Sequence, residues 1–493
     1  MTDDLLADVE AAAGFAVHGG PGPAARRGLV ARGVPGLLAG QDPTLWGPAA
    51  EERARERLGF LDAYRPGAEL LPLIAELREE LGDLHRVVLA GPGRAAEAAT
   101  RLLDRPLTVL DDPDPHRVRA LLDDAALLRR TVVLLIDETL GSVFWQAYRD
   151  AGLTAAEAGR HFVVLGNAPP ELAAAGAVTI GAGPGALSAA TLVPAAFAGV
   201  DVAALIDEAE LFAPSLADEQ DNPALALGAA LAAARRVLLV PDGPGLDGLG
   251  EWAAEVITAG LGLPVIVADC PRDAGPVPAD LLTVSYGGCL PPAGVPGGGM
   301  GPAVAVNGPL GAHFLAWPYA VALAAHVRGA DPFRDLPPAA TEAVHDTPSF
   351  VEGPVEIFTT GTATDLRGAL RELLATAEGQ IRVQAFLDPA GDAAVARLRP
   401  LLAAATGLPV GFGWGGLRPG EPPYGSFLQI TGAVTGDVPV PGRDSTLGDR
   451  QAARAAGDRR LLAGHGRPLL RLHLTDRPEG IGHLLAAAGT SRH

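Results

Sequence analysis

The stretch GAGPGALSAATLVPAAFAGVD, residues 181–201, runs from a glycine-rich loop into an apolar helix. Glycines let a ligand approach the backbone closely, and a helix N-terminus favours negative charge. This arrangement is typical of an anion-binding loop. However, the loop contains no Arg, Lys, His, Ser or Thr before Ser188. The stretch therefore predicts a binding loop, with Gly181, Gly183 and Ser188 as its candidate residues, that lacks a cation.

Short apolar runs rich in β-branched residues alternate with helical patterns on both sides of this stretch. The candidate strands are 86–91, 107–112, 131–138, 161–168, 177–183, 235–243, 263–270, 281–287, 302–308, 354–361, 381–388, 427–432 and 469–474. Repeated β-α units with apolar strands predict parallel sheets covered by helices. We therefore expect an α/β fold with two doubly wound domains. The expected divisions are a helical N-terminal region (1–84), two α/β domains (85–215 and 216–435) and a C-terminal helical region that packs on them (436–493).

The composition excludes several functions. The chain has 493 residues and a net charge of −20, so we expect neither nucleic acid nor an anionic membrane as a partner. All 38 basic residues are Arg, which excludes a Schiff-base, pyridoxal-phosphate or P-loop lysine. Cys270 and Cys289 do not form a C-x-x-C pair, so we expect no structural zinc and no disulfide framework. The acidic N-terminus does not resemble a secretory signal, which favours the cytoplasm.

Two long segments, 172–200 and 281–327, carry no Asp, Glu, Lys or Arg. Segments of this length can span a bilayer. Glycine and proline interrupt both of them, and short strand patterns occur within them. We therefore expect a buried α/β interior rather than membrane spans. A helix is expected over about 191–212, with Pro194 in its first turn.

Ligands of doubly wound folds bind beyond the carboxyl ends of the strands. The loop after the first strand, AGPGRAA (90–96), offers Gly91, Gly93 and Arg94. The loop after the strand at 131–136 offers Thr139, Gly141 and Ser142 as possible ligand-binding groups. The nine residues of these three loops are the candidate substrate-binding set.

Several segments, in order, are similar to the glucose-6-phosphate isomerase family, most of all to its actinobacterial members. The segment ALSAATLVPAAFAGVDVAALIDEA (186–209) resembles the helix that follows the family's signature loop. The matching segments are LWGPAAEERARERLGFLD (45–62), DNPALALGAALAAA (221–234), LGAHFLAWPYAVALAAHVRGADPF (310–333) and GSFLQITG (425–432). The resemblance covers about 40–475 and implies two sugar-isomerase (SIS-type) domains that assemble as a dimer.

The family interconverts glucose 6-phosphate and fructose 6-phosphate, and this chain departs from its pattern at each catalytic group. Asp137 and Glu138 stand where the family has a Ser-Lys pair in its phosphate loop. Gly183 stands at the place of the Arg that stabilises the enediolate, and Ala259 at that of the Glu base. Arg418 stands at the place of the ring-opening His. Gln451 lies near the place of the family's C-terminal Lys.

Few titratable residues remain as replacements. His313, His345 and Glu352 are the remaining candidates, and Glu255 lies one helical turn before Ala259. For each of them an ordinary structural role competes with a catalytic one, so we assign no catalytic residue, no metal and no cofactor. Whether the protein is an enzyme stays open.

The resulting hypothesis is a cytoplasmic family protein with impaired catalysis that binds a sugar phosphate or related sugar. We expect a homodimer or a partner of a carbohydrate enzyme, with a regulatory or scaffold role. One alternative is an active aldose–ketose isomerase with rearranged residues, acting on a sugar phosphate or on a neutral or amino sugar. Another is a Rossmann-like nucleotide-binding protein, suggested by GPGRAA followed by Asp111 and Asp112.

Overall fold

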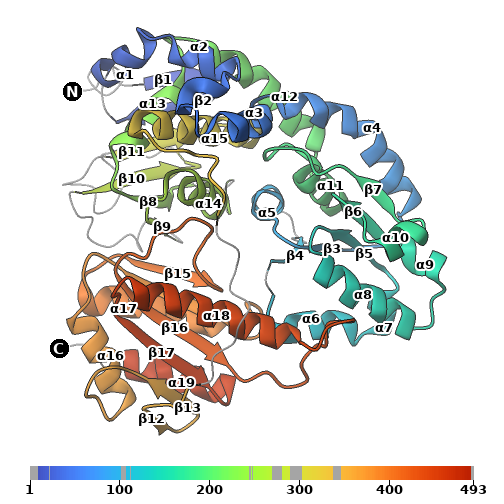
Figure 1. Cartoon of the computed structure of the whole chain (residues 1–493), viewed down its shortest axis with the longest axis vertical. Coiled ribbons are helices and arrows are strands. Elements are labelled where there is room, and N and C mark those ends of the chain that lie inside the picture. Colours follow the sequence, from blue (N-terminus) through green and yellow to red (C-terminus); the bar gives the residue numbers. More distant parts are fainter. Residues whose placement is uncertain are drawn as a thin grey trace. The chain divides into compact units, whose positions relative to one another are not determined.

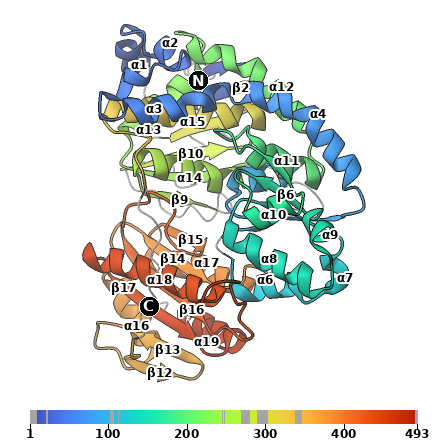
Figure 2. The same ribbon diagram turned by 45° about the vertical axis from the view of Figure 1, so that its right-hand side comes forward.

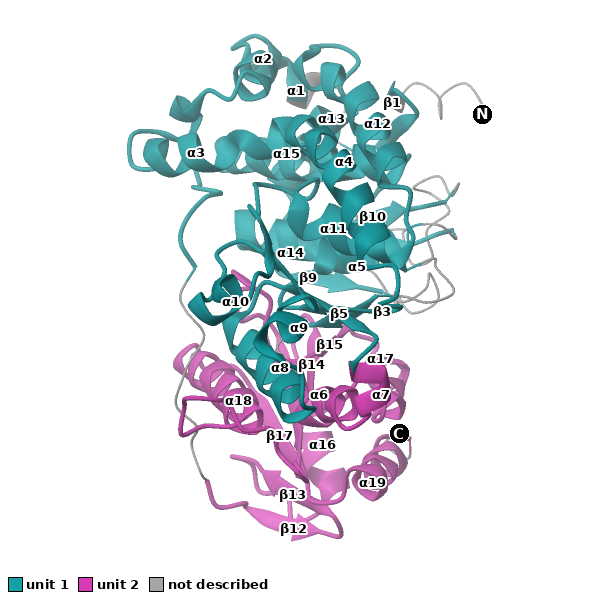
Figure 3. Ribbon diagram, turned by 90° about the vertical axis from the view of Figure 1, so that its right-hand side faces the viewer, with its two compact units in different colours: residues 1–111, 129–271, 277–336 teal, residues 112–128, 272–276, 337–493 magenta. Residues whose placement is uncertain are grey.

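The computed structural model divides the chain into two compact units, which are described separately (Figure 3). Unit 1 comprises residues 1–111, 129–271 and 277–336, and unit 2 comprises residues 112–128, 272–276 and 337–493. Within them the structure describes residues 9–20, 23–101, 107–111, 113–243, 246, 248–268, 280–288, 303–336 and 346–489. Cys270, Cys289 and His345 lie outside these residues.

The first sheet of unit 1 is a five-stranded parallel sheet with the order β4-β3-β5-β6-β7. Its strands are β3 (Arg86–Ala90), β4 (Thr108–Leu110), β5 (Thr131–Leu135), β6 (Phe162–Leu165) and β7 (Val178–Ile180). Its associated helices are α5 (Arg94–Thr100), α8 (Glu138–Asp150), α9 (Ala155–Gly159), α10 (Pro170–Ala174) and α11 (Ala189–Ala198). The strand order reverses next to β3, so the carboxyl ends of β3 and β5 form the topological switch point.

The second sheet of unit 1 has the order β1-β2-β11-β10-β8-β9. The parallel strands are β8 (Arg236–Pro241), β9 (Val265–Val267), β10 (Leu281–Tyr286) and β11 (Ala303–Asn307). The N-terminal hairpin of β1 (Val9–Ala12) and β2 (Phe15–Gly19) extends this sheet antiparallel to β11. The region 1–84 is therefore not purely helical, since Phe15 and Val17 are buried as part of a strand.

Unit 1 has further helices beside its two sheets (Figures 1 and 2). They are α1 (Pro23–Val30), α2 (Val34–Ala39), α3 (Glu51–Arg57), α4 (Tyr64–Glu80), α12 (Val202–Phe212), α13 (Pro223–Ala233), α14 (Leu249–Leu261) and α15 (Leu310–Arg328), with the 3-10 turns η1 (Pro43–Trp46), η2 (Leu58–Asp62) and η3 (Ala213–Ala217). The expected helix over 191–212 is divided in two at Gly199, which has a φ of 105°. Pro194 lies inside α11 rather than in a first turn, so that expectation is wrong.

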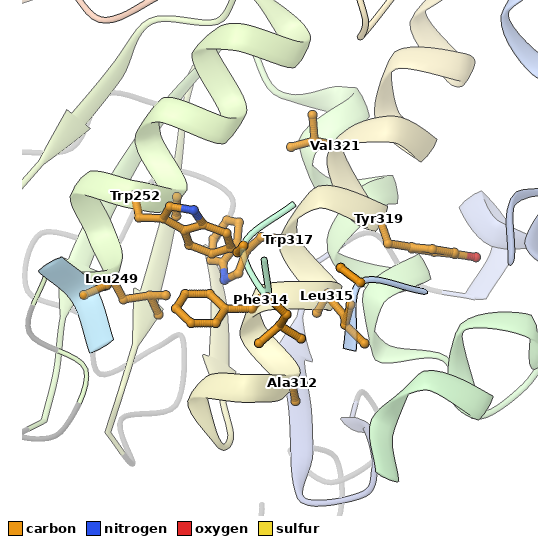
Figure 4. Packing of buried hydrophobic residues seen from close by; sticks show 14 of the residues in the cluster. Leu249, Trp252, Ala312, Phe314, Leu315, Trp317, Tyr319 and Val321 are labelled. Carbon is orange, nitrogen blue, oxygen red and sulfur yellow. The ribbon is translucent and has the colours of Figure 1, made fainter. Parts of the chain in front are cut away.

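Helix α15 is the central helix of unit 1. It is the one helix among the described residues that is long and apolar enough to cross a membrane, and 78% of its most apolar window is buried inside the protein. It packs against α12, α13 and α14, and Figure 4 shows Trp252 of α14 beside Phe314 and Trp317 of α15. The Trp252 and Phe314 rings meet edge to face, with centroids 4.9 Å apart. An apolar surface on all sides therefore serves helix packing here.

Unit 2 contains one six-stranded sheet with the order β12-β13-β17-β16-β14-β15. Its strands are β12 (Phe350–Glu352), β13 (Val355–Phe358), β14 (Ile381–Phe386), β15 (Val410–Trp414), β16 (Ser426–Gly432) and β17 (Leu469–Leu474). Its helices are α6 (Pro115–Leu122), α7 (Ala125–Leu128), α16 (Leu366–Ala375), α17 (Leu398–Thr406), α18 (Leu447–Gly464) and α19 (Arg477–Gly489), with the 3-10 turn η6 (Ala393–Arg397). The strands β15, β14, β16 and β17 are parallel, and β13 joins β17 antiparallel.

The α/β class is confirmed, but the expected division at 216–435 differs from the structure. Strands β8 to β11 belong to a sheet of unit 1, whereas β14 to β16 belong to unit 2. The region 436–493 contains β17, which lies between β13 and β16 in the sheet. Strand pairing between distant segments decides these boundaries, and it leaves no local mark in the sequence.

His313 is part of the α15 core and is fully buried. Its Nδ1 accepts a hydrogen bond from Nε1 of Trp317 at 3.0 Å, and its ring meets Phe15 edge to face. Burial lowers the pKa of His313 to about 3. The side chain is therefore neutral at physiological pH, and its buried contacts indicate a structural role.

Substitution of Gly311 tests the close packing of α15. A Cβ at Gly311 would lie 2.0 Å from the carbonyl oxygen of Leu205 and 2.8 Å from Cβ of Glu208. We expect Gly311→Ala to lower the free energy of unfolding by about 1–3 kcal/mol, because helix α12 must move away. Gly36→Ala in α2 is the control, since a Cβ there meets nothing within 4 Å. Denaturant unfolding followed by tryptophan fluorescence measures the free energy of unfolding of both variants. Equal values for the two would contradict the close contact between α15 and α12.

His313 also predicts a pH dependence of stability. The unfolded chain binds a proton at His313 below the ordinary pKa of about 6.5, whereas the folded chain does not. The contribution of His313 to the free energy of unfolding is therefore fully present above that pH. It is lost as pH falls, by up to about 1.4 kcal/mol per pH unit. His313→Gln keeps an acceptor for Trp317 without titrating, so we expect a shallower loss of unfolding free energy between pH 7 and 4.5. His465→Gln, at an exposed position, is the control; parallel pH profiles for wild type and His313→Gln would refute the assignment.

Candidate functional site

A cavity of about 520 Å³ lies within unit 1, and its volume is in the range of small-molecule sites. Its walls come from α3 and η2, the β3–α5 loop, residues 184–186 with the start of α11, α14, Pro318 of α15 and Phe333. Helix α5 packs against both α11 and α14, which brings the end of β3 to this cavity (Figure 1). Two Arg, Arg57 and Arg94, and two Glu, Glu56 and Glu255, supply the charges among its described lining residues.

Arg94 is the first residue of α5 and lines the cavity. Its guanidinium donates a hydrogen bond to Oε2 of Glu97 at 3.0 Å. Burial by itself lowers the pKa of Arg94, but the carboxylates of Glu97, Glu251, Asp111 and Glu255 raise it above its ordinary value. Arg94 is therefore a permanent cation in a surrounding that is rich in carboxylates.

Glu255 lies on α14, one turn after Trp252, and is half-buried in the cavity wall. Ala259, at the place of the family's Glu, lines the same cavity one turn later. The structure thus brings Glu255 and Arg94 into one cavity. The sequence contained a signal for this arrangement. Trp252, Glu255 and Ala259 follow helical spacing and therefore lie on one face of the helix, together with apolar residues.

The loop after β5 uses its polar groups internally. Oδ1 of Asp137 accepts hydrogen bonds from the backbone N–H groups of Thr139 (2.7 Å) and Leu140 (3.2 Å). Oγ of Ser142 donates to the carbonyl of Thr139 at 2.8 Å. A Cβ at Gly141 would lie 2.7 Å from a methyl carbon of Leu135, so this glycine serves packing. A carboxylate of the chain itself therefore occupies the N-terminus of α8, where an anion would bind.

Packing also explains the glycines after β3. Gly91 has a φ of 134°, and a Cβ there would lie 2.7 Å from Cβ of Ile136. The backbone N–H groups of Ile136 and Asp137 both donate to the carbonyl of Ala90. These hydrogen bonds join the carboxyl ends of β3 and β5 at the switch point. A Cβ at Gly93 would lie 2.3 Å from Cδ2 of Leu89. These contacts require glycine whether or not a ligand binds.

The loop that precedes α11 reaches the cavity by its later residues. Pro184, Gly185 and Ala186 line the cavity, whereas Gly181, Gly183 and Ser188 do not. Gly183 has a φ of 70°, and Ser188 is the buried N-cap residue of α11 without a side-chain capping bond. Arg94 of α5 and Arg57 of α3 are the cations that line the same cavity as these later residues.

Of the nine candidate residues, the cavity brings together Gly93 and Arg94. The other seven, Gly91, Thr139, Gly141, Ser142, Gly181, Gly183 and Ser188, are not among its lining residues. Two further residues from the sequence analysis, Glu352 and Arg418, lie in unit 2: Oε2 of Glu352 accepts from the N–H of Leu366, and Arg418 lies 3.6 Å from Glu421. Over the described ranges, no three His, Cys, Asp or Glu side chains gather as metal ligands.

Comparison with known proteins finds sugar isomerases. No family model matches the chain. A protein from Haloarcula marismortui named "Probable glucose-6-phosphate isomerase" is 30% identical over 213 residues, an alignment that covers 37% of this chain. The chain spans about half, 48%, of that relative's length.

Among solved structures, glucose-6-phosphate isomerase from Chlamydia trachomatis aligns with a TM-score of 0.50 and 12% identity, over 68% of this chain and 88% of that protein. The hypothetical protein TT0462 from Thermus thermophilus aligns with a TM-score of 0.49 and 19% identity, over 63% of this chain and 90% of that protein. The chain is thus similar in part of its sequence to a glucose-6-phosphate isomerase, and it has the sugar-isomerase type of α/β fold.

Proposed function

We propose that the unit 1 cavity binds a sugar phosphate or a related sugar, and that the protein acts by binding this ligand rather than by rapid isomerisation. The observation that carries the proposal is Arg94, a permanent cation at the N-terminus of α5 that lines a cavity of ligand size. An Arg at a helix N-terminus offers both side-chain and backbone donors to an anionic or hydroxylated ligand. The sequence similarity to an isomerase supports a sugar as the ligand class.

The charges and the proton carriers of this cavity support the proposal of impaired catalysis. Isomerisation through an enediolate needs a cation that faces the developing negative charge, and loss of such a group typically costs about 10²–10³ in rate. Arg94 already has Glu97 at 3.0 Å, and three further carboxylates act on it. Ring opening needs a group that releases and accepts a proton, which an arginine does poorly. Among the described residues that line this cavity, none is a His or a Lys.

The cellular role extends this proposal. A binding protein on an isomerase fold fits regulation or scaffolding of carbohydrate enzymes in the cytoplasm. We propose that it acts as a homodimer or together with an authentic enzyme of sugar metabolism.

Calorimetric titration of the purified chain tests the binding. We expect glucose 6-phosphate or fructose 6-phosphate to bind, and Arg94→Ala to weaken that binding by about 10–100-fold, since hydrogen bonds to charged groups contribute about 1.5–3 kcal/mol. Arg101→Ala is the control, because Arg101 lies at the end of the same helix outside the cavity lining. Absence of binding by any sugar, or equal affinities for the two variants, would overturn the proposal.

A second candidate function is weak isomerisation by Arg94 and Glu255 themselves. The observation that favours it is that a cation and a carboxylate line one cavity, since proton transfer between neighbouring carbons requires a carboxylate and enediolate stabilisation requires a cation.

Conversion of fructose 6-phosphate to glucose 6-phosphate separates the two functions. For a binding protein we expect turnover at least about 100-fold below that of an ordinary isomerase, and no change on Glu255→Gln. Turnover by the wild type that Glu255→Gln abolishes, while ligand affinity stays within about twofold, would establish Glu255 as the base and favour the second candidate.

A further inference from the structure

The two faces of the unit 2 sheet differ: one is apolar, and the other combines polar side chains with the apolar Phe427 and Leu469. Leu428, Ile430, Leu470 and Leu472 belong to the apolar core cluster to which α16, α17 and α19 also contribute. The alternate residues of the same strands point to the opposite side. These residues are Gln384 of β14, Gln429 and Thr431 of β16, Arg471 and His473 of β17, and Glu356 of β13, and they are called the polar face below. Parallel sheets are usually apolar on both faces, so this one is unusual.

The strand register places these side chains beside one another. Gln429 pairs with Gln384 on one side and with Arg471 on the other. In the next row, His473 pairs with both Thr431 and Glu356. Paired residues of neighbouring strands project on the same side of a sheet. The polar groups therefore form a continuous patch of two rows.

Helix α18 covers this patch mainly with small residues, and Gln451 is the longer side chain that α18 adds to the described lining. Gly448, Ala452, Ala455 and Ala456 of α18 line a cavity together with Gln429, Thr431, Arg471, His473 and Glu356. The cavity has a volume of about 380 Å³, which is in the range of small-molecule sites. Short side chains on the helix thus leave room above long polar side chains on the sheet.

Gln429 is the observation that points to a ligand. It is fully buried and lines the cavity. Its Nε2 donates to Oε1 of Gln384 (3.2 Å) and to the carbonyl of Ala455 (3.1 Å), and these two acceptors fix the orientation of the amide. Its Oε1 is buried and accepts no hydrogen bond from the part of the chain that the structure describes. A buried acceptor without a partner is costly, so a bound donor would stabilise it.

The remaining groups of the cavity both donate and accept hydrogen bonds. Thr431 Oγ1 and His473 Nδ1 lie 2.9 Å apart. The Arg471 guanidinium lies over the Phe358 ring, 3.7 Å from its centroid, and donates to Oδ2 of Asp346 at 2.9 Å. Besides Arg471, the lining contains three carboxylates, those of Asp346, Glu356 and Asp437. Arg459 also pairs with Asp346, so three carboxylates face two arginines, and the remaining negative charge disfavours an anionic ligand.

We propose that this cavity binds a small uncharged polyhydroxylated molecule, a free sugar or a polyol. A hydroxyl group can donate to Gln429 Oε1 and accept from Arg471 or Thr431, which matches the mixed lining. The carboxylates disfavour a phosphate on the ligand. The described lining residues of this cavity all belong to unit 2 and none of them lines the unit 1 cavity, so the proposal gives unit 2 a binding role of its own.

Calorimetry on the full chain tests the proposal with glucose and myo-inositol as probes and with glucose 6-phosphate and glucosamine as charged counterparts. We expect an uncharged probe to bind, and Gln429→Leu to weaken it by about tenfold through loss of one acceptor. Ala452→Leu projects a larger side chain over the cavity from an exposed position, and we expect it to weaken the same probe at least as much. This variant carries the test if Gln429→Leu fails to fold.

Two matched control variants test whether the loss of affinity arises at this cavity. Ala463→Leu adds the same side chain at an exposed position of α18 outside the cavity lining, and Arg94→Ala removes the cation of the unit 1 cavity. We expect neither to change the affinity for the uncharged probe. The proposal is overturned if neither uncharged probe binds at millimolar concentration, or if their binding survives both Gln429→Leu and Ala452→Leu. It is equally overturned if Arg94→Ala abolishes their binding, or if a charged counterpart binds more tightly to the site that these variants define.

Discussion

The burial of helix α15 is the constraint on which unit 1 depends. Because the helix is apolar around its circumference, every side of it must be covered, and α12, α13 and α14 pack directly on it. The crossings are so close that Gly228 and Gly311 have no room for a Cβ. The edge-to-face contact of Trp252 with Phe314 then fixes α14, and thereby the side of α14 that carries Glu255. The position of a polar residue in the cavity is thus a consequence of apolar packing behind it.

A second constraint acts at the carboxyl ends of the first sheet. A helix N-terminus presents N–H groups that need acceptors, and either a ligand or a side chain can provide them. At α8 the chain provides its own acceptor, the Asp137 carboxylate, which also places a negative charge there. At α5 the N-cap is Gly93, no side chain caps the helix, and Arg94 follows. The difference between these two helix starts moves the candidate site away from the α8 loop and toward α5.

The sequence predicted the fold class and most of the strands, because both are encoded locally, in apolar runs of the right length and in helix patterns between them; it missed β1, β2, β12 and β15. It did not predict that β17 lies between β13 and β16, or that the hairpin at 9–19 extends a sheet made of residues 236–307, because these pairings join distant segments. The glycines at 91, 93 and 141 suggested ligand contact, yet close packing accounts for each of them. Arg94 was recognised because a cation at the start of a helix after a strand is a local pattern, whereas its proximity to Glu255 depends on the contact between α5 and α14.

The difference between local sequence patterns and contacts of distant segments also explains the polar face of unit 2. The segments 381–386, 426–432 and 469–474 alternate polar and apolar residues, a pattern that ordinarily indicates one solvated face. Here nearly every residue of β14 and β16 is buried, so their polar residues are enclosed rather than solvated, whereas those of β17 are half-buried. Enclosure changes their energetics, because each donor and acceptor now needs a partner that water does not freely supply. Gln384 has Asp458 and Gln429 as partners, whereas Oε1 of Gln429 has none among the described residues. The alternation of these strands is readable from the sequence, whereas their enclosure depends on the covering helix α18, whose small residues Ala452, Ala455 and Ala456 line the cavity.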